Sequence, residues 1–186
     1  MAFTIDTFRT TALSKGGARA NLFDVTIAGA AATTNLAGGV AQFKFACKAA
    51  AIPAMAVGVV EVPYFGRVVK VPGNKTFDNW SVTIINDEGF LVRNGMDKWV
   101  ASTGSHIGNV QSAASSALTG ALYGDATVQH YGKKGPTDKI AEYKFVNIFP
   151  VNLSAIELSW GDNDTIEEFT VEFAYDYWTH AGQVTD

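Results

Sequence analysis

A few residue types in this sequence could support catalysis or metal binding, but their spacing argues against both. The three histidines, His106, His130 and His180, lie far apart in the chain. Zinc sites place their ligands at short, defined spacings, and none of these histidines has a second ligand at such a spacing. We therefore predict no metal site and no cofactor, and we interpret each histidine as a solvated or turn residue.

Three short motifs come close to functional loops, but each is incomplete. Gly104-Ser-His106 does not have the glycines on both sides of the serine that a nucleophile elbow needs. Gly132-Lys-Lys-Gly135 lacks the serine or threonine and the leading glycine of a phosphate-binding loop. Asp162-Asn-Asp164, followed by Glu167, lacks two key residues of a calcium loop, the sharp-turn glycine and the final glutamate, and is interpreted as an acidic turn. No catalytic residue can be named, and we predict that the protein is not an enzyme.

The charge balance points to a surface that other protein chains cover. Of the 186 residues, 14 are lysine or arginine and 18 are aspartate or glutamate, which gives a net charge of −4. Gripping nucleic acid through its phosphates requires clustered cations, so this excess of acid argues against that class of protein. Only 17% of the residues are charged, against about 25% in a typical soluble domain. A surface this poor in charge favours self-assembly.

Length and hydropathy predict one soluble domain over residues 1–186. The most apolar stretch, residues 49–60, is interrupted by Pro53 and Gly58 and is shorter than the roughly 20 residues of a membrane helix. The start of the chain has no apolar signal segment, so we expect synthesis in the cytoplasm and no membrane insertion. The single cysteine, Cys47, cannot form an internal disulfide and lies in an apolar run, where we expect a small buried side chain.

Alternating apolar and polar residues predict a mainly β fold, an antiparallel β-sandwich or barrel. Successive side chains of a strand point to opposite sides, so each alternating run has one buried and one polar face. Between Val151 and Trp160 the phase of the alternation changes, which predicts a β-bulge near Ala155. The alternating runs cover residues 22–27, 42–48, 80–84, 142–145, 151–160 and 168–177. In the last run Phe169, Val171, Phe173, Tyr175 and Tyr177 share one side, and Glu168, Thr170, Glu172 and Asp176 share the other.

One flanking α-helix is predicted over about residues 87–101. Asn86 can serve as its N-cap, and Val92, Met96 and Trp99 follow at the spacing of one helix face.

Three further segments flank these elements. Residues 57–72 read as two short strands joined by a turn at Phe65-Gly66, and the prolines near their ends favour an edge or a projecting hairpin. Residues 1–18 form an N-terminal arm, and residues 102–124 form a loop of small residues.

Several motifs between residues 19 and 100 follow one another in the order of a known family. Together they resemble the tail tube proteins of contractile-tailed bacteriophages, a family related to the tubes of contractile bacteriocins and type VI secretion systems. The motifs are Arg19-Ala-Asn-Leu-Phe23, Cys47-Lys-Ala-Ala50, Ile52-Pro53, Glu61-Val-Pro-Tyr64, Gly66-Arg67, Lys70-Val71, Gly73-Asn-Lys-Thr-Phe77, Trp80, Thr83-Ile-Ile-Asn-Asp87, Arg93-Asn94 and Lys98-Trp99.

The resemblance implies a structural virion protein. Members of this family fold as a β-sandwich or barrel with one flanking helix, and six copies close into a ring whose sheets join into a continuous inner barrel. The rings stack into a rigid tube inside a contractile sheath, and viral DNA passes through the bore. The implied partners are further copies of the chain, the tail sheath, the baseplate and the tail terminator, with DNA in transient, non-specific passage.

Two sets of residues are candidates for these roles. Pro63, Tyr64, Arg67 and Lys70 are candidates for ring stacking, since tyrosine and arginine are favoured at interface hot spots. The alternative for the hairpin is a free, solvent-exposed arm. Glu168, Glu172 and Asp176 are candidates for lining the bore, because acidic and small neutral groups let DNA slide. The alternative for these acids is an outer face that is solvated or touches the sheath.

Two other functions are compatible with the sequence. The same tube could belong to a contractile bacteriocin or a secretion machine that carries no DNA. The chain could instead be a monomeric β-sandwich module that binds carbohydrate or a cell surface, although its polar outward faces show no aromatic platform. Sedimentation separates these classes, because a module stays monomeric and a tube protein forms hexamers or polymers.

Overall fold

The computed structural model describes residues 4–108, 110–111, 122–135 and 137–181. The described chain is mainly β, with one large antiparallel sheet, a separate two-stranded hairpin and several short helices. This arrangement confirms the predicted fold class. Among the described residues, no helix is long and apolar enough to cross a membrane.

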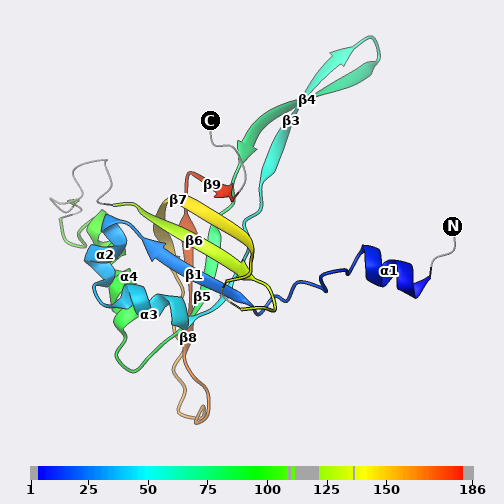
Figure 1. The fold of residues 1–186 in the computed structure, drawn as a ribbon. Coiled ribbons are helices and arrows are strands. Elements are labelled where there is room, and N and C mark those ends of the chain that lie inside the picture. The colour runs from blue at the N-terminus through cyan, green and yellow to red at the C-terminus, as the bar shows by residue number, and fades with distance from the viewer. Residues whose placement is uncertain (1–3, 109, 112–121, 136, 182–186) are drawn as a thin grey trace.

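The large sheet has seven strands, in the order β1-β6-β7-β8-β5-β2, with β9 also paired to β7 (Figure 1). In β7, residues up to Val146 pair with β9, and residues from Phe149 onward pair with β8. Between them Asn147 has a φ of +57°, a left-handed conformation that asparagine adopts more readily than most residues. β7 therefore links two halves of the sheet. The strand bounds are β1 Phe23–Ala28, β2 Cys47–Ala50, β5 Trp80–Ile85, β6 Gly124–Tyr131, β7 Lys139–Leu153, β8 Glu168–Ala174 and β9 Tyr177–His180.

An apolar core joins the two halves of the sheet. Trp80 of β5 stacks on Phe145 of β7, with ring centroids 4.4 Å apart, and Phe173 of β8 lies 5.6 Å from the same tryptophan ring. The buried residues alternate along three strands as predicted, namely Val25 and Ile27, then Trp80, Val82 and Ile84, then Phe169, Val171 and Phe173. The described strands do not close into a barrel, because β1 and β2 are the two ends of the strand order.

The predicted flanking helix is α4 (Leu91–Thr103), and it buries Val92, Met96 and Trp99 as expected. The indole nitrogen of Trp99 donates to the carbonyl oxygen of Leu122 at 2.9 Å. The predicted N-cap is wrong. Phe90 occupies the cap position in a left-handed conformation, and the Asp87 carboxylate accepts a bond from the Leu91 amide at 3.3 Å.

The structure adds two helices beside α4 that the sequence pattern did not predict, α2 (Ala30–Leu36) and α3 (Gly39–Ala46). The strand expected at residues 42–48 is therefore wrong up to Ala46, and only β2 follows it. Because α3 is a helix, its two phenylalanines point in different directions: Phe43 is fully buried, and Phe45 is 82% exposed. Gly95 of α4 allows α2 to approach, because a Cβ there would lie 2.9 Å from the Leu36 Cα.

Two predicted strands are shorter in the structure. β7 ends at Leu153, and its register shift lies between Pro150 and Asn152, so the bulge predicted near Ala155 is displaced along the chain. Residues 154–167 form a loop, so the strand predicted over residues 151–160 is wrong after Leu153, and the acidic turn predicted at Asp162-Asn-Asp164 lies within this loop. The last run breaks after Ala174, and β9 pairs with β7 in the other half of the sheet. In the first case the chain leaves the sheet, and in the second it crosses to the other half of the sheet.

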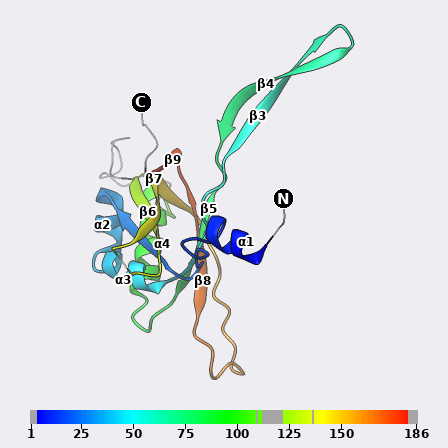
Figure 2. The same ribbon diagram turned by 45° about the vertical axis from the view of Figure 1, so that its right-hand side comes forward.

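Three segments extend away from the sheet and its helices (Figures 1 and 2). The hairpin of β3 (Ala56–Tyr64) and β4 (Arg67–Thr76) projects from one end, and the loop of residues 154–167 projects from the opposite end. In the N-terminal arm, α1 (Ile5–Thr11) has Thr4 as its N-cap and buries none of its residues. The small-residue loop predicted at 102–124 lies partly outside the described residues, which omit 109 and 112–121; its first two residues complete α4, and its last begins β6.

The helical conformation of α3 can be tested with two neighbouring phenylalanines. Phe43→Ala should lower the free energy of unfolding by about 3–5 kcal/mol, because it removes a fully buried ring. Phe45→Ala is the matched control and should change it by less than about 0.5 kcal/mol, because that ring is exposed. Urea unfolding of the unassembled chain, followed by tryptophan fluorescence, measures both values. Equal losses would mean that both rings face the core, as in a strand.

Candidate functional site

The residues that could bind a metal do not gather in the described part of the chain. No three His, Cys, Asp or Glu side chains among them gather as metal ligands. A ring nitrogen of His130 lies 3.0 Å from a backbone carbonyl oxygen, and His180 packs edge-on against Tyr143, so both histidines make structural contacts. Cys47 is half-buried, and desolvation raises the pKa of its thiol to about 12, which disfavours the reactive thiolate. The distinctive feature of the chain is instead its exposed apolar surface.

The hairpin β3–β4 has a well-defined turn at its tip. Phe65 has a φ of +43° and Gly66 a φ of +77°. Two consecutive positive angles are those of a type I′ turn, whose twist matches the twist of the flanking strands. Tyr64 pairs with Arg67 directly across this turn. The local sequence thus holds the two strands together although no other part of the described chain covers them.

Both faces of the hairpin are apolar and exposed. Val59 and Val60 are neighbours in β3 and therefore point to opposite faces, and both are more than half exposed. Val68 and Val69 repeat this arrangement in β4. An isolated two-stranded hairpin is marginally stable in water, and contiguous exposed apolar surface marks interaction sites. The hairpin therefore has the properties of a segment that another surface covers.

The four candidate stacking residues lie in the outer part of the hairpin and are all exposed: Pro63, Tyr64, Arg67 and Lys70. The Lys70 ammonium is 4.0 Å from the Glu61 carboxylate, a surface ion pair that contributes little stability. Sequence reasoning missed Phe65, which is 90% exposed and packs edge-on against Tyr64 with ring centroids 4.6 Å apart. The sequence did contain a signal for Phe65: it is a large apolar residue in a turn, where small and polar residues dominate.

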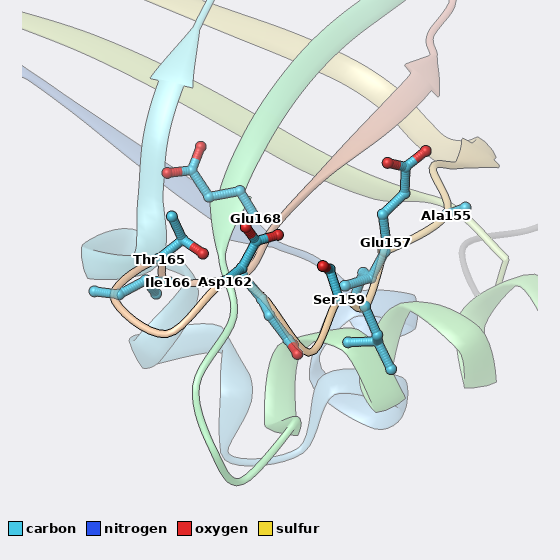
Figure 3. A pocket seen from close by; sticks show the side chains of 10 residues that line it. Ala155, Glu157, Ser159, Asp162, Thr165, Ile166 and Glu168 are labelled. Carbon is cyan, nitrogen blue, oxygen red and sulfur yellow. The ribbon is translucent and has the colours of Figure 1, made fainter.

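The loop of residues 154–167 forms a second exposed apolar surface. Leu158 and Ile166 are largely exposed, and Trp160 is fully exposed. The two arms of the loop border an open pocket of about 350 Å³. Figure 3 shows Glu157 on the arm that leaves β7, Ile166 on the arm that leads to β8, and Asp162 between them. Because the sequence predicted a strand here, this surface was not among the candidates.

The half of the sheet that contains β5 and β8 turns a polar face away from the core. Residues that pair directly across antiparallel strands share a face, as Ser81 does with Glu172, and Thr83 with Thr170. The two threonine hydroxyl oxygens are 3.5 Å apart. Glu168, two residues before Thr170, lies on the same side. We call the surface formed by these five residues the polar sheet face.

Only two of the three acidic candidates for the bore lie on the polar sheet face. Glu168 and Glu172 are both there, four residues apart on β8. Asp176 lies in the turn between β8 and β9, where its carboxylate accepts a hydrogen bond of 2.6 Å from the Asn147 side-chain amide. The Lys48 ammonium lies 2.5 Å from the Glu168 carboxylate. The polar sheet face therefore combines three small hydroxyl groups with two carboxylates, one of which is paired with Lys48.

Comparison with known proteins agrees with the motifs in the sequence. The chain matches the model of the phage tail tube protein family over residues 18–181. It is 30% identical over 141 residues to tail tube protein gp19 of Enterobacteria phage T4, which covers 74% of this chain and 81% of that protein. The gp19 protein of Enterobacteria phage T6 matches with the same identity and coverage.

Solved structures share the fold over most of its length. One is a chain of the sheath–tube complex of an extracellular contractile injection system, PVC, in its extended state, with a TM-score of 0.63, 14% identity, and 96% of this chain and 98% of that chain covered. Another is a chain of the anti-feeding prophage tube-terminating cap, with a TM-score of 0.63, 16% identity, and 88% and 90% covered. At these identities the similarity concerns the fold alone.

Proposed function

The chain belongs to the phage tail tube protein family, and from this we propose that six copies close into a ring and that rings stack into the inner tube of a contractile tail. The observation that carries the proposal is the hairpin β3–β4, an apolar ribbon exposed on both faces. In a monomer this surface would stay in water. A stack of identical rings gives every hairpin a neighbouring copy to cover it.

Ring closure is supported by the open ends of the large sheet. The strand order begins at β1 and ends at β2, and β9 forms a further edge beside β7, so each copy offers unpaired sheet edges to its neighbours. Unpaired strand edges invite pairing with another chain. A head-to-tail contact that closes after a fixed number of copies removes all such edges. We propose that the sheets of six copies join in this way into one continuous inner barrel.

The polar sheet face is the surface that we assign to the bore. A bore lined with cations would bind the phosphates of DNA, whereas small hydroxyl groups and carboxylates offer no such attachment. Thr83, Thr170 and Glu172 give this face that character, and Lys48 is held in an ion pair with Glu168. Phage DNA would therefore pass along the polar sheet face without being retained.

The other proposed partners are the tail sheath, the baseplate and the tail terminator, which would place the protein in the virion. The sheath–tube complex of the PVC injection system, which contains a chain of the same fold, supports a surrounding sheath. A tube of a bacteriocin or secretion machine would share all these contacts except the DNA cargo. A monomeric binding module would leave the hairpin uncovered, and its sedimentation as a single chain would refute the tube.

Ring stacking can be tested at the hairpin with Tyr64→Ala combined with Arg67→Ala. The double variant should still form rings but no tubes, because it removes an aromatic ring and a cation from the end of the hairpin while the large sheet is unchanged. Negative-stain electron microscopy distinguishes rings from tubes, and Lys98→Ala on the exposed face of α4 is the matched control. Tubes of normal length in the double variant would contradict the assignment.

The bore assignment can be tested with Glu168→Lys combined with Glu172→Lys. The new cations should bind passing phosphates and slow DNA ejection, and added salt should relieve the effect because phosphate contacts weaken as salt rises. Asp176→Lys is the matched control, since Asp176 lies off the polar sheet face. Ejection from purified virions is followed by the fluorescence of a DNA-binding dye. Normal ejection by well-formed virions of the double variant would show that this face does not line the bore.

A further inference from the structure

The two exposed apolar surfaces of the chain lie at opposite ends of the molecule. In both views the hairpin β3–β4 projects from one end and the loop of residues 154–167 from the other (Figures 1 and 2). A hairpin therefore cannot reach the loop of its own chain. When identical copies are stacked in one orientation, however, the hairpin end of one copy faces the loop end of the next.

The two surfaces carry opposite charge. Residues 56–76 contain one acidic residue, Glu61, and three basic residues, Arg67, Lys70 and Lys75, for a net charge of +2. Residues 154–167 contain four acidic residues and no lysine or arginine, for a net charge of −4; the acids are Glu157, Asp162, Asp164 and Glu167. Opposite charge on two projecting segments favours their encounter and sets their orientation.

The chemistry of the hairpin tip also matches the chemistry of the loop pocket. The tip presents two aromatic rings, Tyr64 and Phe65, next to the guanidinium of Arg67. The pocket between the arms of the loop is mainly polar: its lining includes the carboxylates of Glu157 and Asp162 (Figure 3) as well as the apolar side chains of Leu158 and Ile166. The Arg67 guanidinium can pair with these carboxylates, and the aromatic rings of the tip can pack on the exposed Leu158 and Ile166.

We propose that the tip of the hairpin docks on the loop of residues 154–167 of a second copy in the adjacent ring. The proposal rests on the tube proposed above and names the surface that receives each hairpin. The contact joins two different surfaces of the same chain, so it is heterologous and leaves a free hairpin at one end of a stack and a free loop at the other. Stacking through it propagates along the tube axis in a single direction.

The docking is tested by cross-linking a cysteine at each surface in assembled tubes. The variant carries Val68→Cys beside the tip and Ser159→Cys in the loop, both at exposed positions, and is treated with a bismaleimide. Cys47, which is half-buried, is replaced by alanine in this variant and in the control, so that only the introduced thiols can be cross-linked. Denaturing gels should show a ladder that continues beyond six chains, since each cross-link leads into the next ring. Val68→Cys with Lys98→Cys, an exposed residue of α4, is the matched control and should give no ladder.

Each outcome of this experiment decides the proposal. Normal tubes that give no ladder, or a ladder that ends at six chains, would overturn the docking while leaving the tube intact. A wild-type chain that forms neither rings nor tubes would overturn the tube itself, and the docking with it.

A charge exchange gives a second measurement that does not depend on cross-linking. Arg67→Glu with Lys70→Glu should abolish tubes, because the hairpin then carries a net charge of −2 opposite a loop of −4. Asp162→Lys with Asp164→Lys should also abolish them, because it removes the net charge of the loop and places two new cations opposite Arg67 and Lys70. The combined fourfold variant should recover tubes, since the new glutamates of the hairpin can pair with the new lysines of the loop. Replacing the loop changes in that variant with Asp97→Lys and Asp138→Lys, which lie outside the loop, should give no recovery. Equal recovery in both fourfold variants would show that the loop is not the partner of the hairpin.

Discussion

A two-stranded ribbon leaves the backbone groups on its two outer edges unpaired, and in this chain both of its faces also carry exposed valines. An isolated hairpin of this kind is only marginally stable in water. Its apolar area and its edge groups are satisfied only when another surface covers them. In the proposed tube this condition makes two demands: the chain must hold the hairpin clear of its own core, and it must present another surface that the hairpin of a second copy can contact.

The large sheet meets both needs. β7 passes through both of its halves, with Asn147 at the change from one set of partners to the other, and the apolar core around Trp80 holds the halves together. Because the core is internal to one chain, the sheet can carry projections without losing its own stability. The hairpin leaves at one end and the loop of residues 154–167 at the other (Figure 1), which gives each copy a direction. A directional subunit is what a tube of stacked rings requires.

Sequence reasoning predicted the strands whose two faces differ in environment and failed where that contrast is absent. β1, β5 and β8 each have a buried and a polar face, so their alternation is unambiguous. The run that contains Phe43 and Phe45 is too short to separate a strand from a helix by periodicity, and packing of α3 against β1 and α4 decided the outcome. After Leu153 the apolar residues still alternate, but Leu158 and Trp160 are exposed. A pattern of apolar residues does not indicate whether protein or water surrounds them. Asp176 was grouped with Glu172 by parity, but the chain turns at this point and leaves β8.

The residue types and their local order determined several features of this protein without any structure. These include the mainly β fold, the turn at Phe65-Gly66, the family to which the motifs of residues 19–100 belong, and the poverty of charge that favours assembly. These features depend on residues that are close in the sequence or on the overall composition, so the sequence is sufficient to predict them. Tertiary structure alone decided that α2 and α3 pack beside α4, that Glu168 is paired with Lys48, and that a basic apolar ribbon and an acidic apolar loop point in opposite directions. Those relations join residues far apart in the sequence, and their positions are set by how the two halves of one sheet close over a common core.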